Sequence, residues 1–401
     1  MRGLAMLSLV TWRRGYVVIL FAFAAALATS PGQTFLVSLF VSPMSHELQI
    51  SEADLAWLYG IGTLAGAIFL PWLGRQIDSV DLLKVSALAS TFLLVGCIVA
   101  STASSRLAVL IAYFLVRIAG PGLLSLISAA SIARYFHRER GVALALAALG
   151  FAVGEGLLPL VTSESIWEIG WRSTFAVLGI VTWLTLILAG YFVRGRTRLR
   201  IPRNRDVNIS EPITSKGVKT NAAFWCIVIC LAIPSGTETA LLFHQSTIAR
   251  LSNLSPLVFA QGFIVYAIVQ IPSSILGGKL IDQHRSSVAL LIHSLPMLAG
   301  LGLFSLFPKP WTAWIFLAGL SMTAAVNSLL RTTSLVERYG SAKVGTTRSL
   351  LSTTNVIFNA VGPPVLGILL AFGNSISEIL FACAAALIVG VIALMPIVAR
   401  R

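Results

Sequence analysis

The chain has 401 residues, of which 57% are hydrophobic and only 11% are charged, and its formal net charge is +14. Soluble domains carry about 25% charged residues, so this composition excludes an ordinary water-soluble protein. The positive charge would suit a nucleic-acid partner, but no basic face is interleaved with exposed aromatic residues, and we expect no nucleic-acid binding.

Twelve stretches are long and apolar enough to cross a bilayer, since a membrane helix needs about 20 apolar residues. They fill the chain and leave no room for a water-soluble domain. Their approximate ranges are 16–40, 55–74, 83–103, 107–132, 141–162, 172–193, 222–248, 257–278, 287–307, 311–335, 345–371 and 376–398. The sequence therefore predicts an all-α, polytopic membrane protein with twelve transmembrane helices.

A basic segment with few large apolar residues divides these spans into two sets of six. Such a composition is typical of a water-facing linker. We predict a six-helix bundle over residues 1–193, a cytoplasmic linker over 194–221, and a second six-helix bundle over 222–401.

The positions of the basic residues predict the orientation in the membrane. If the N-terminus lies inside, only Arg106, Arg172, Arg250 and Lys309 of the 29 basic residues fall in outer loops, and Arg117 falls within a span. Cytoplasmic loops of membrane proteins carry an excess of lysine and arginine. We therefore expect a multi-pass protein of the inner (plasma) membrane with both termini in the cytoplasm.

The two halves share an internal repeat. Gly74 and Asp78 after span 2 recur as Gly278 and Asp282 after span 8, displaced by 204 positions. The same offset relates Arg134-Tyr135 to Arg338-Tyr339, Gly141 to Gly345, and Pro159 to Pro363. Parallel repeats of this kind place two bundles about an axis along the membrane normal, with a binding site between them. We therefore predict two bundles related by a pseudo-two-fold axis.

The paired G-x-x-x-D elements, the Arg117…Gly120-Pro121-Gly122 run in span 4, and Arg140-Gly141 at the start of span 5 together resemble the major facilitator superfamily. The resemblance covers essentially the whole chain. It implies a secondary transporter that works by rocking of two bundles, with spans 1, 4, 7 and 10 lining the cavity. It also implies a gating role for residues of the inner loops: Gly74, Asp78, Gly278, Asp282 and Arg140.

Two further features bear on the branch of the family. Trp171-Arg172 at the start of span 6 and Gly32-Gln33 in span 1 are similar to the monocarboxylate and oxalate/formate branch. In span 5, Gly150-x-x-x-Gly154-Glu155-Gly156 is similar to a motif of drug/proton antiporters, with glutamate where that motif has proline. These resemblances imply a small organic anion such as a monocarboxylate as substrate, with export of a drug or cation in exchange for protons as the alternative.

Arg117, Glu155 and Glu238 are the ionisable residues within spans that we expect to carry function, because a charge inside the membrane is costly. Arg117 could hold an anionic substrate, or it could be a structural arginine bonded to backbone carbonyls. Glu155 lies within one turn of the depth of Arg117, and we expect an ion pair that is either permanent or broken during transport.

Glu238 lies near the middle of span 7, and the repeat aligns it with Thr34, beside Gln33 at the Ser30–Thr34 break in span 1. We expect Glu238 to face the cavity and to compete with Glu155 as the proton-coupling group. Amides in spans 10 and 11 are further lining residues, unless they serve only to join helices. They are Asn327, Asn355 and Asn359.

These observations predict a proton-coupled symporter that binds a small-molecule substrate and H⁺ and works by alternating access. No P-loop, Ser/His pair, paired aspartates or metal-ligand cluster lies at a suitable position, so we expect no enzyme activity, cofactor or metal. Each half supplies a partner for the other, and a monomer would suffice. A membrane sensor built on the same scaffold without net transport is the alternative from a different class.

Overall fold

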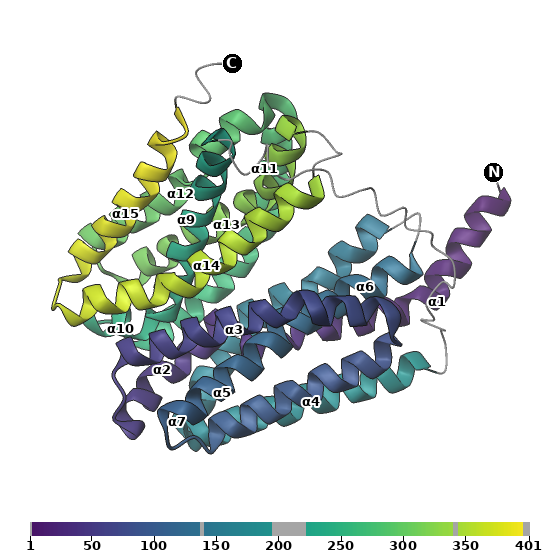
Figure 1. Cartoon of the computed structure of the whole chain (residues 1–401), viewed down its shortest axis with the longest axis horizontal. Helices are drawn as coiled ribbons and strands as arrows, with labels where there is room; N and C mark the ends of the chain where they lie inside the picture. Colours follow the sequence, from purple (N-terminus) through teal and green to yellow (C-terminus); the bar gives the residue numbers. More distant parts are fainter. Residues whose placement is uncertain (1, 137–139, 195–221, 340–343, 396–401) are drawn as a thin grey trace. The chain divides into compact units, whose positions relative to one another are not determined.

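The computed structural model describes residues 2–136, 140–194, 222–339 and 344–395, and in these ranges every regular element is a helix (Figure 1). Ten of the described helical stretches are long and apolar enough to cross a membrane. The stretch Arg140–Arg194 contains two of the expected spans, because Gly170, with a φ of 77°, breaks its helical geometry. The shorter apolar helix Ile376–Ile392 corresponds to the last span. The all-α membrane fold is thus confirmed, whereas most of the predicted linker lies outside the described residues.

The first compact unit comprises residues 1–50 and 61–205. Its helices are α1 (Arg2–Leu27), η1 (Ser30–Gly32), α2 (Thr34–Leu48), most of α3 (Glu52–Ser79), α4 (Leu82–Ser101), α5 (Arg106–Arg117), η2 (Ile118–Leu124), α6 (Ser125–Tyr135) and α7 (Arg140–Arg194). Within this unit α7 packs along α1 and α4, and α1 also packs on α6.

Two of the expected spans in this unit are interrupted in the middle. Span 1 is broken at the 3₁₀ turn η1, as the sequence predicts, and span 4 passes through the π-helical segment η2, which contains Pro121. The two interruptions pack directly on each other, because a Cβ added to Gly32 would lie 2.7 Å from the Cδ of Pro121 in η2. It would also lie 2.1 Å from the carbonyl oxygen of Val116 in the last turn of α5. Gly32 is therefore needed for the close approach of two backbones.

The second compact unit comprises residues 51–60 and 206–401. Its helices are α9 (Ala222–Phe243), α10 (Gln245–Leu251), α11 (Pro256–Ile292), α12 (Leu295–Leu306), α13 (Pro310–Tyr339), α14 (Val344–Ala371) and α15 (Ile376–Ile392). Within it α9 lies along α14, and α13 lies along α11 and α12 (Figure 1).

The first turns of α3, up to residue 60, belong to this second unit. Glu52 accepts a hydrogen bond from Thr247 and lies 3.4 Å from the guanidinium of Arg250. The ring of Tyr59 packs on Phe243, with 4.8 Å between the ring centroids. Helix α3 therefore belongs to two units, a division that the hydrophobic pattern of span 2 does not indicate.

The internal repeat is seen more clearly in the positions at which helices begin than in the identical residues that the two halves share. Helices α3 and α11 begin at Glu52 and Pro256, α5 and α13 at Arg106 and Pro310, and α7 and α14 at Arg140 and Val344, each pair 204 positions apart. The same offset relates two left-handed residues that precede α3 and α11, Gln49 with a φ of 53° and Asn253 with a φ of 54°. The six-helix unit is therefore duplicated in its backbone geometry as well as in its sequence.

The G-x-x-x-D elements differ from the loops that we expected. The first lies within α3 and the second within α11, and α11 continues to Ile292 without a break. No proline follows Gly278 before Pro296, so nothing in this stretch ends the helix. Asp282 and Arg140 are exposed, the side chains of residues 74–79 lie outside the described part, and the gating role of all these residues stays a prediction.

Candidate substrate and coupling site

Arg117 closes α5 and reaches across to the break in span 1. Its Nε donates a hydrogen bond to Thr63 Oγ1 at 3.1 Å, and an Nη atom donates to the carbonyl oxygen of Gly32 at 3.0 Å. A carbonyl in a broken membrane helix needs such a donor, because no water is available in the bilayer core. These contacts favour the structural alternative for Arg117, and its role in binding substrate stays a prediction.

The repeat places Ser321 of α13 where Arg117 stands in the first unit. Ser321 Oγ donates to the carbonyl oxygen of Tyr266 in α11 at 2.7 Å. In both units this position thus joins the fourth span to the second span of its bundle. The equivalence is a second reason to regard Arg117 as a residue that joins helices.

Glu155 is 4% exposed and lies in α7 next to the η1 turn. A Cβ added to the neighbouring Gly154 would lie 2.3 Å from Ser30 Oγ, so α7 packs directly on this turn. Arg117 and the α7 segment around Glu155 therefore approach the same turn from two helices. Their ion pair stays a prediction, as does a coupling role for Glu155.

Gln33 and Thr34 follow the same turn and begin α2, and both side chains are half-buried. The amide nitrogen of Gln33 lies 3.4 Å from Thr29 Oγ1, so this side chain contacts the turn itself. Both residues therefore follow the break in span 1 directly along the chain, and their contact with substrate stays a prediction.

The Trp171-Arg172 pair carries much of the expected similarity to the monocarboxylate branch, and it has a local structural role. Both side chains hold the carboxylate of Glu47, with Trp171 Nε1 2.6 Å from Oε2 and Arg172 Nε 2.7 Å from Oε1. The guanidinium of Arg172 also donates to the carbonyl oxygen of Ser101 at 2.8 Å. The pair thus fixes the ends of three helices of the first unit, and the branch assignment stays a prediction.

Glu238 lies in α9, and a buried tyrosine holds its carboxylate. The hydroxyl of Tyr266, which is 2% exposed in α11, donates a hydrogen bond to Glu238 Oε1. The backbone of Tyr266 is in turn fixed by Ser321. The carboxylate of Glu238 therefore has a defined position inside the second unit.

The three predicted amides lie close to the same helix. The side-chain amide of Asn359 donates to Ser235 Oγ at 3.0 Å and to the carbonyl oxygen of Asn355 at 3.2 Å, in the amide orientation that its neighbours require. Asn327 Nδ2 donates to the carbonyl oxygen of Leu231 at 3.0 Å. Each of these two contacts joins α9 to another helix, α14 or α13, which is the joining alternative. A role of the amides in lining the cavity stays a prediction.

Arg331 lies four residues before the end of the span expected at 311–335, and the structure places it among these residues. Its Nε is buried in α13, and its charge interacts electrostatically with that of Glu238. A sequence signal for it existed, because Thr323, Asn327 and Arg331 follow one another at intervals of four residues. Such spacing places three polar side chains on one face of a helix.

We call Ser235, Glu238, Tyr266, Asn327, Arg331, Asn355 and Asn359 the polar column. Ser235 and Leu231, which receive the contacts from α14 and α13, are one turn of α9 apart, or about 6 Å along the helix axis. Helices α9, α11, α13 and α14 all contribute to the column, which places a carboxylate and a guanidinium in one polar group inside a membrane-spanning bundle.

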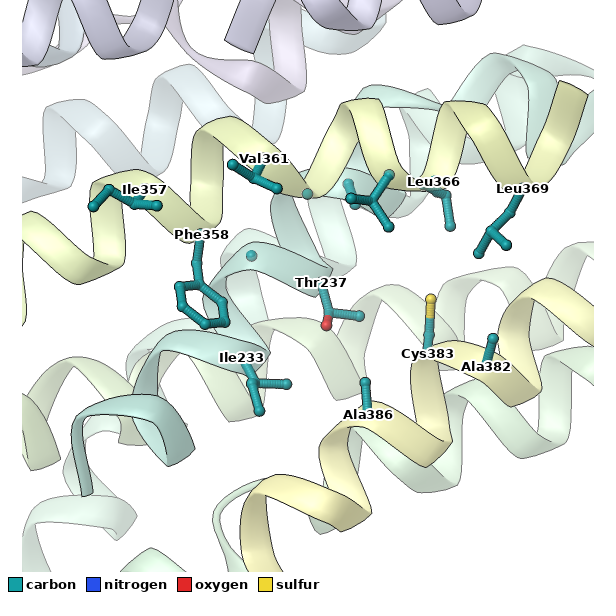
Figure 2. Close-up of a pocket in the computed structure, with 14 residues that line it drawn as sticks. Ile233, Thr237, Ile357, Phe358, Val361, Leu366, Leu369, Ala382, Cys383 and Ala386 are labelled. Carbon is teal, nitrogen blue, oxygen red and sulfur yellow. The ribbon is translucent and has the colours of Figure 1, made fainter. Parts of the chain in front are cut away.

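A cavity of about 320 Å³ lies on the opposite face of α9, between α9, α14 and α15 (Figure 2). At about 100° per residue, its lining residues Ile233 and Ala240 point away from Glu238, and Thr237 points roughly at a right angle to it. Thr237 and Cys383 are the polar side chains in an otherwise apolar lining. This cavity suits a hydrocarbon group and is separate from the polar column.

Two solved structures share the fold at low sequence identity. A bacterial homolog of the human lysosomal transporter Spinster, in an inward-facing conformation, aligns over 96% of this chain and 95% of its own, with a TM-score of 0.68 and 17% identity. The nucleoside transporter NupG aligns over 94% and 98%, with a TM-score of 0.75 and 13% identity.

Curated relatives match a smaller part of the chain. The enterobactin exporter EntS of Escherichia coli O81 (strain ED1a) and that of Shigella flexneri are each 30% identical over 145 residues, which is 35% of this chain and 35% of each exporter. The match thus spans about a third of the length of these relatives. The family model of the Major Facilitator Superfamily matches residues 18–345. With that match, the chain belongs to the Major Facilitator Superfamily.

Proposed function

We propose that the protein is a secondary active transporter that couples movement of a small organic solute across the inner membrane to protons. The observation that carries this proposal is Glu238, a carboxylate in a membrane-spanning helix, held by Tyr266 and within electrostatic reach of Arg331. Intramembrane carboxylates of this kind are typical proton carriers. We place both termini in the cytoplasm on the basis of the distribution of lysine and arginine.

The driving force is sufficient without nucleotide hydrolysis. Moving one elementary charge through a potential of 100 mV yields about 2.3 kcal/mol. One proton taken up by Glu238 on one side and released on the other could therefore sustain a concentration ratio of roughly 50 for an uncharged substrate, because about 1.4 kcal/mol corresponds to a factor of ten. A monoanion that moves with one proton carries no net charge across the membrane, so the pH gradient alone drives its accumulation. Alternating access would open Glu238 first to one side of the membrane and then to the other, as this cycle requires.

The substrate class that we favour is a small organic anion, since the polar column contains a buried guanidinium nitrogen. Export in exchange for protons is the second candidate. It is favoured by the partial match to the enterobactin exporters and by the drug-antiporter-like motif around Glu155.

Proteoliposomes loaded with a pH-sensitive dye test this proposal and its direction. Organic acids, nucleosides and lipophilic cations are added outside, one at a time, and protein-free liposomes correct for passive permeation. Symport acidifies the lumen, whereas antiport of an entering substrate makes it alkaline. We expect Glu238→Gln to abolish this proton movement but to leave substrate counterflow, and the exposed Glu168→Gln to change neither. A signal that persists in Glu238→Gln would refute the role of Glu238 in coupling.

A further inference from the structure

We propose that Arg331 and Asn327 form a subsite for the charged end of the substrate, and that the substrate is a small organic acid that also carries a hydroxyl or N–H donor. The inference rests on the proposed transport function and specifies its substrate. It arises from buried polar atoms of the second unit whose hydrogen-bonding capacity is unused within the described part of the chain.

The first of these atoms is the Nε of Arg331. It is buried and has no hydrogen-bond partner among the described residues. Leaving a buried donor without a partner destabilises a protein, and more so when the group is charged, so such groups in native proteins usually have a ligand, an ion or a water as partner. A guanidinium with an available donor suits a carboxylate, which it can bind through two parallel hydrogen bonds.

The second atom is Oδ1 of Asn327, one turn away on the same face of α13. Asn327 is 1% exposed, and its Nδ2 is committed to the carbonyl oxygen of Leu231. This contact fixes the orientation of the amide, because only the nitrogen can donate to a carbonyl. Oδ1 is therefore an acceptor, and it has no partner among the residues described. A donor on a ligand or a water would satisfy it.

Asn355 of α14 offers a second acceptor of the same kind. Its Oδ1 is buried and also lacks a partner in the described ranges. The backbone oxygen of Asn355 accepts a hydrogen bond from the side-chain amide of Asn359. The same amide also donates a hydrogen bond to Ser235 of α9. Asn355 is thus part of the polar column. The column offers one cationic donor and two neutral acceptors, which a hydroxy acid or an amino acid complements and a simple fatty acid does not.

Glu238 explains how such a subsite would favour symport. Within the described ranges, Tyr266 and Arg331 are the titratable or charged groups that act on Glu238. While Glu238 is ionised, its negative charge offsets that of Arg331 and weakens the attraction of an anion. Once Glu238 takes up a proton, the charge of Arg331 is no longer offset. Proton and anion therefore favour each other's binding, as linkage requires.

Binding by purified protein in detergent, measured by calorimetry and by thermal shift, tests the subsite. The probes are L-lactate, L-malate and D-gluconate, each paired with the acid that lacks its hydroxyl groups, namely propionate, succinate and hexanoate. Lactamide, which lacks the carboxylate, is a further control. We expect at least one hydroxy acid to bind, its unhydroxylated partner to bind about tenfold more weakly or worse, and lactamide not to bind.

Variants separate binding from folding. Arg331→Gln should lose at least about tenfold in affinity for the hydroxy acid, whereas Arg331→Lys, which keeps the charge and the fold, should retain part of it. Asn327→Leu should bind the hydroxy acid and its unhydroxylated partner about equally. Lys309→Gln, at an exposed position just before α13, is the matched control and should bind like the wild type.

The outcomes distinguish this inference from the proposed transport. If the wild type binds neither a hydroxy acid nor an acid with an N–H donor, with L-alanine as the probe, or if folded Arg331→Gln binds one of them unchanged, the subsite is refuted. Should a nucleoside or a cation instead drive proton movement that depends on Glu238, the transport proposal survives and the acid subsite does not. Hydroxy-acid binding that depends on Arg331, without any flux in liposomes, would support the subsite and refute transport.

Discussion

The hydroxyl of Tyr266 in α11 donates a hydrogen bond to the carboxylate of Glu238 in α9, and both residues lie in the second unit. Hydrogen bonds to charged groups contribute about 1.5–3 kcal/mol. Tyr266→Phe removes the bond with little change in shape. We expect the rate of coupled proton movement in liposomes to fall by about tenfold or more, and its pH profile to change.

Tyr191→Phe is the matched control for this experiment, because the Tyr191 side chain is 75% exposed. It should leave both the rate and the pH profile unchanged. A Tyr266→Phe variant with the wild-type rate and pH profile would show that the carboxylate works without this hydrogen bond, and coupling would then have to be sought at Glu155.

Arg117 supports a broken helix through its bonds to Gly32 and Thr63, so its loss should affect stability before it affects substrate recognition. We expect both Arg117→Gln and Arg117→Lys to destabilise the protein by about 2 kcal/mol or more, since neither reproduces the two directed donors of guanidinium. The measurement is the apparent Tm in detergent, with the exposed Lys84→Gln as control. Variants with normal Tm but lost acid binding would instead make Arg117 a substrate ligand.

Gly32 and Gly278 offer a paired test of backbone packing. A methyl group at Gly32 would lie 2.1 Å from the carbonyl oxygen of Val116, whereas one at Gly278 would have no atom within 4 Å. Because Gly32 packs against backbone, Gly32→Ala must displace η1 from η2, and we expect poor expression or a clearly lower Tm. Gly278→Ala lies in a helix and should stabilise it by about 0.5–1 kcal/mol. Equal Tm values for the two variants would contradict the close contact of η1 and η2.

The sequence alone was sufficient for the number of spans, the repeat and the break in span 1, because hydrophobic length and proline or glycine act locally. It also located Glu238, since a carboxylate in the middle of an apolar run is conspicuous. It did not locate Tyr266 as the partner, because that contact joins residues 28 positions apart on two helices. Pairing across helices depends on packing, which a single sequence does not specify.

Arg331 is a residue for which the position in the sequence is misleading. Near the predicted end of a span, an arginine is usually able to extend its charge toward the headgroups, so the position of Arg331 alone favours a peripheral residue. Helix α13 continues to Tyr339, beyond the predicted end of the span at 335, and the Nε of Arg331 is buried. The end of an apolar run was a poor guide to the end of the helix, and the polar stripe through Asn327 was the better indicator.

The apolar cavity beside α9 provides the last prediction. Ala386 of α15 lines it opposite Thr237 of α9, so a larger side chain at position 386 would fill empty space (Figure 2). Cavity-filling substitutions commonly add about 0.5–2 kcal/mol of stability. We expect Ala386→Leu to raise the apparent Tm in detergent while leaving coupled proton movement unchanged, because the cavity and Glu238 lie on opposite faces of α9. Lost transport with a raised Tm would show that the cavity must stay open during the cycle, and would connect this face of α9 to substrate movement.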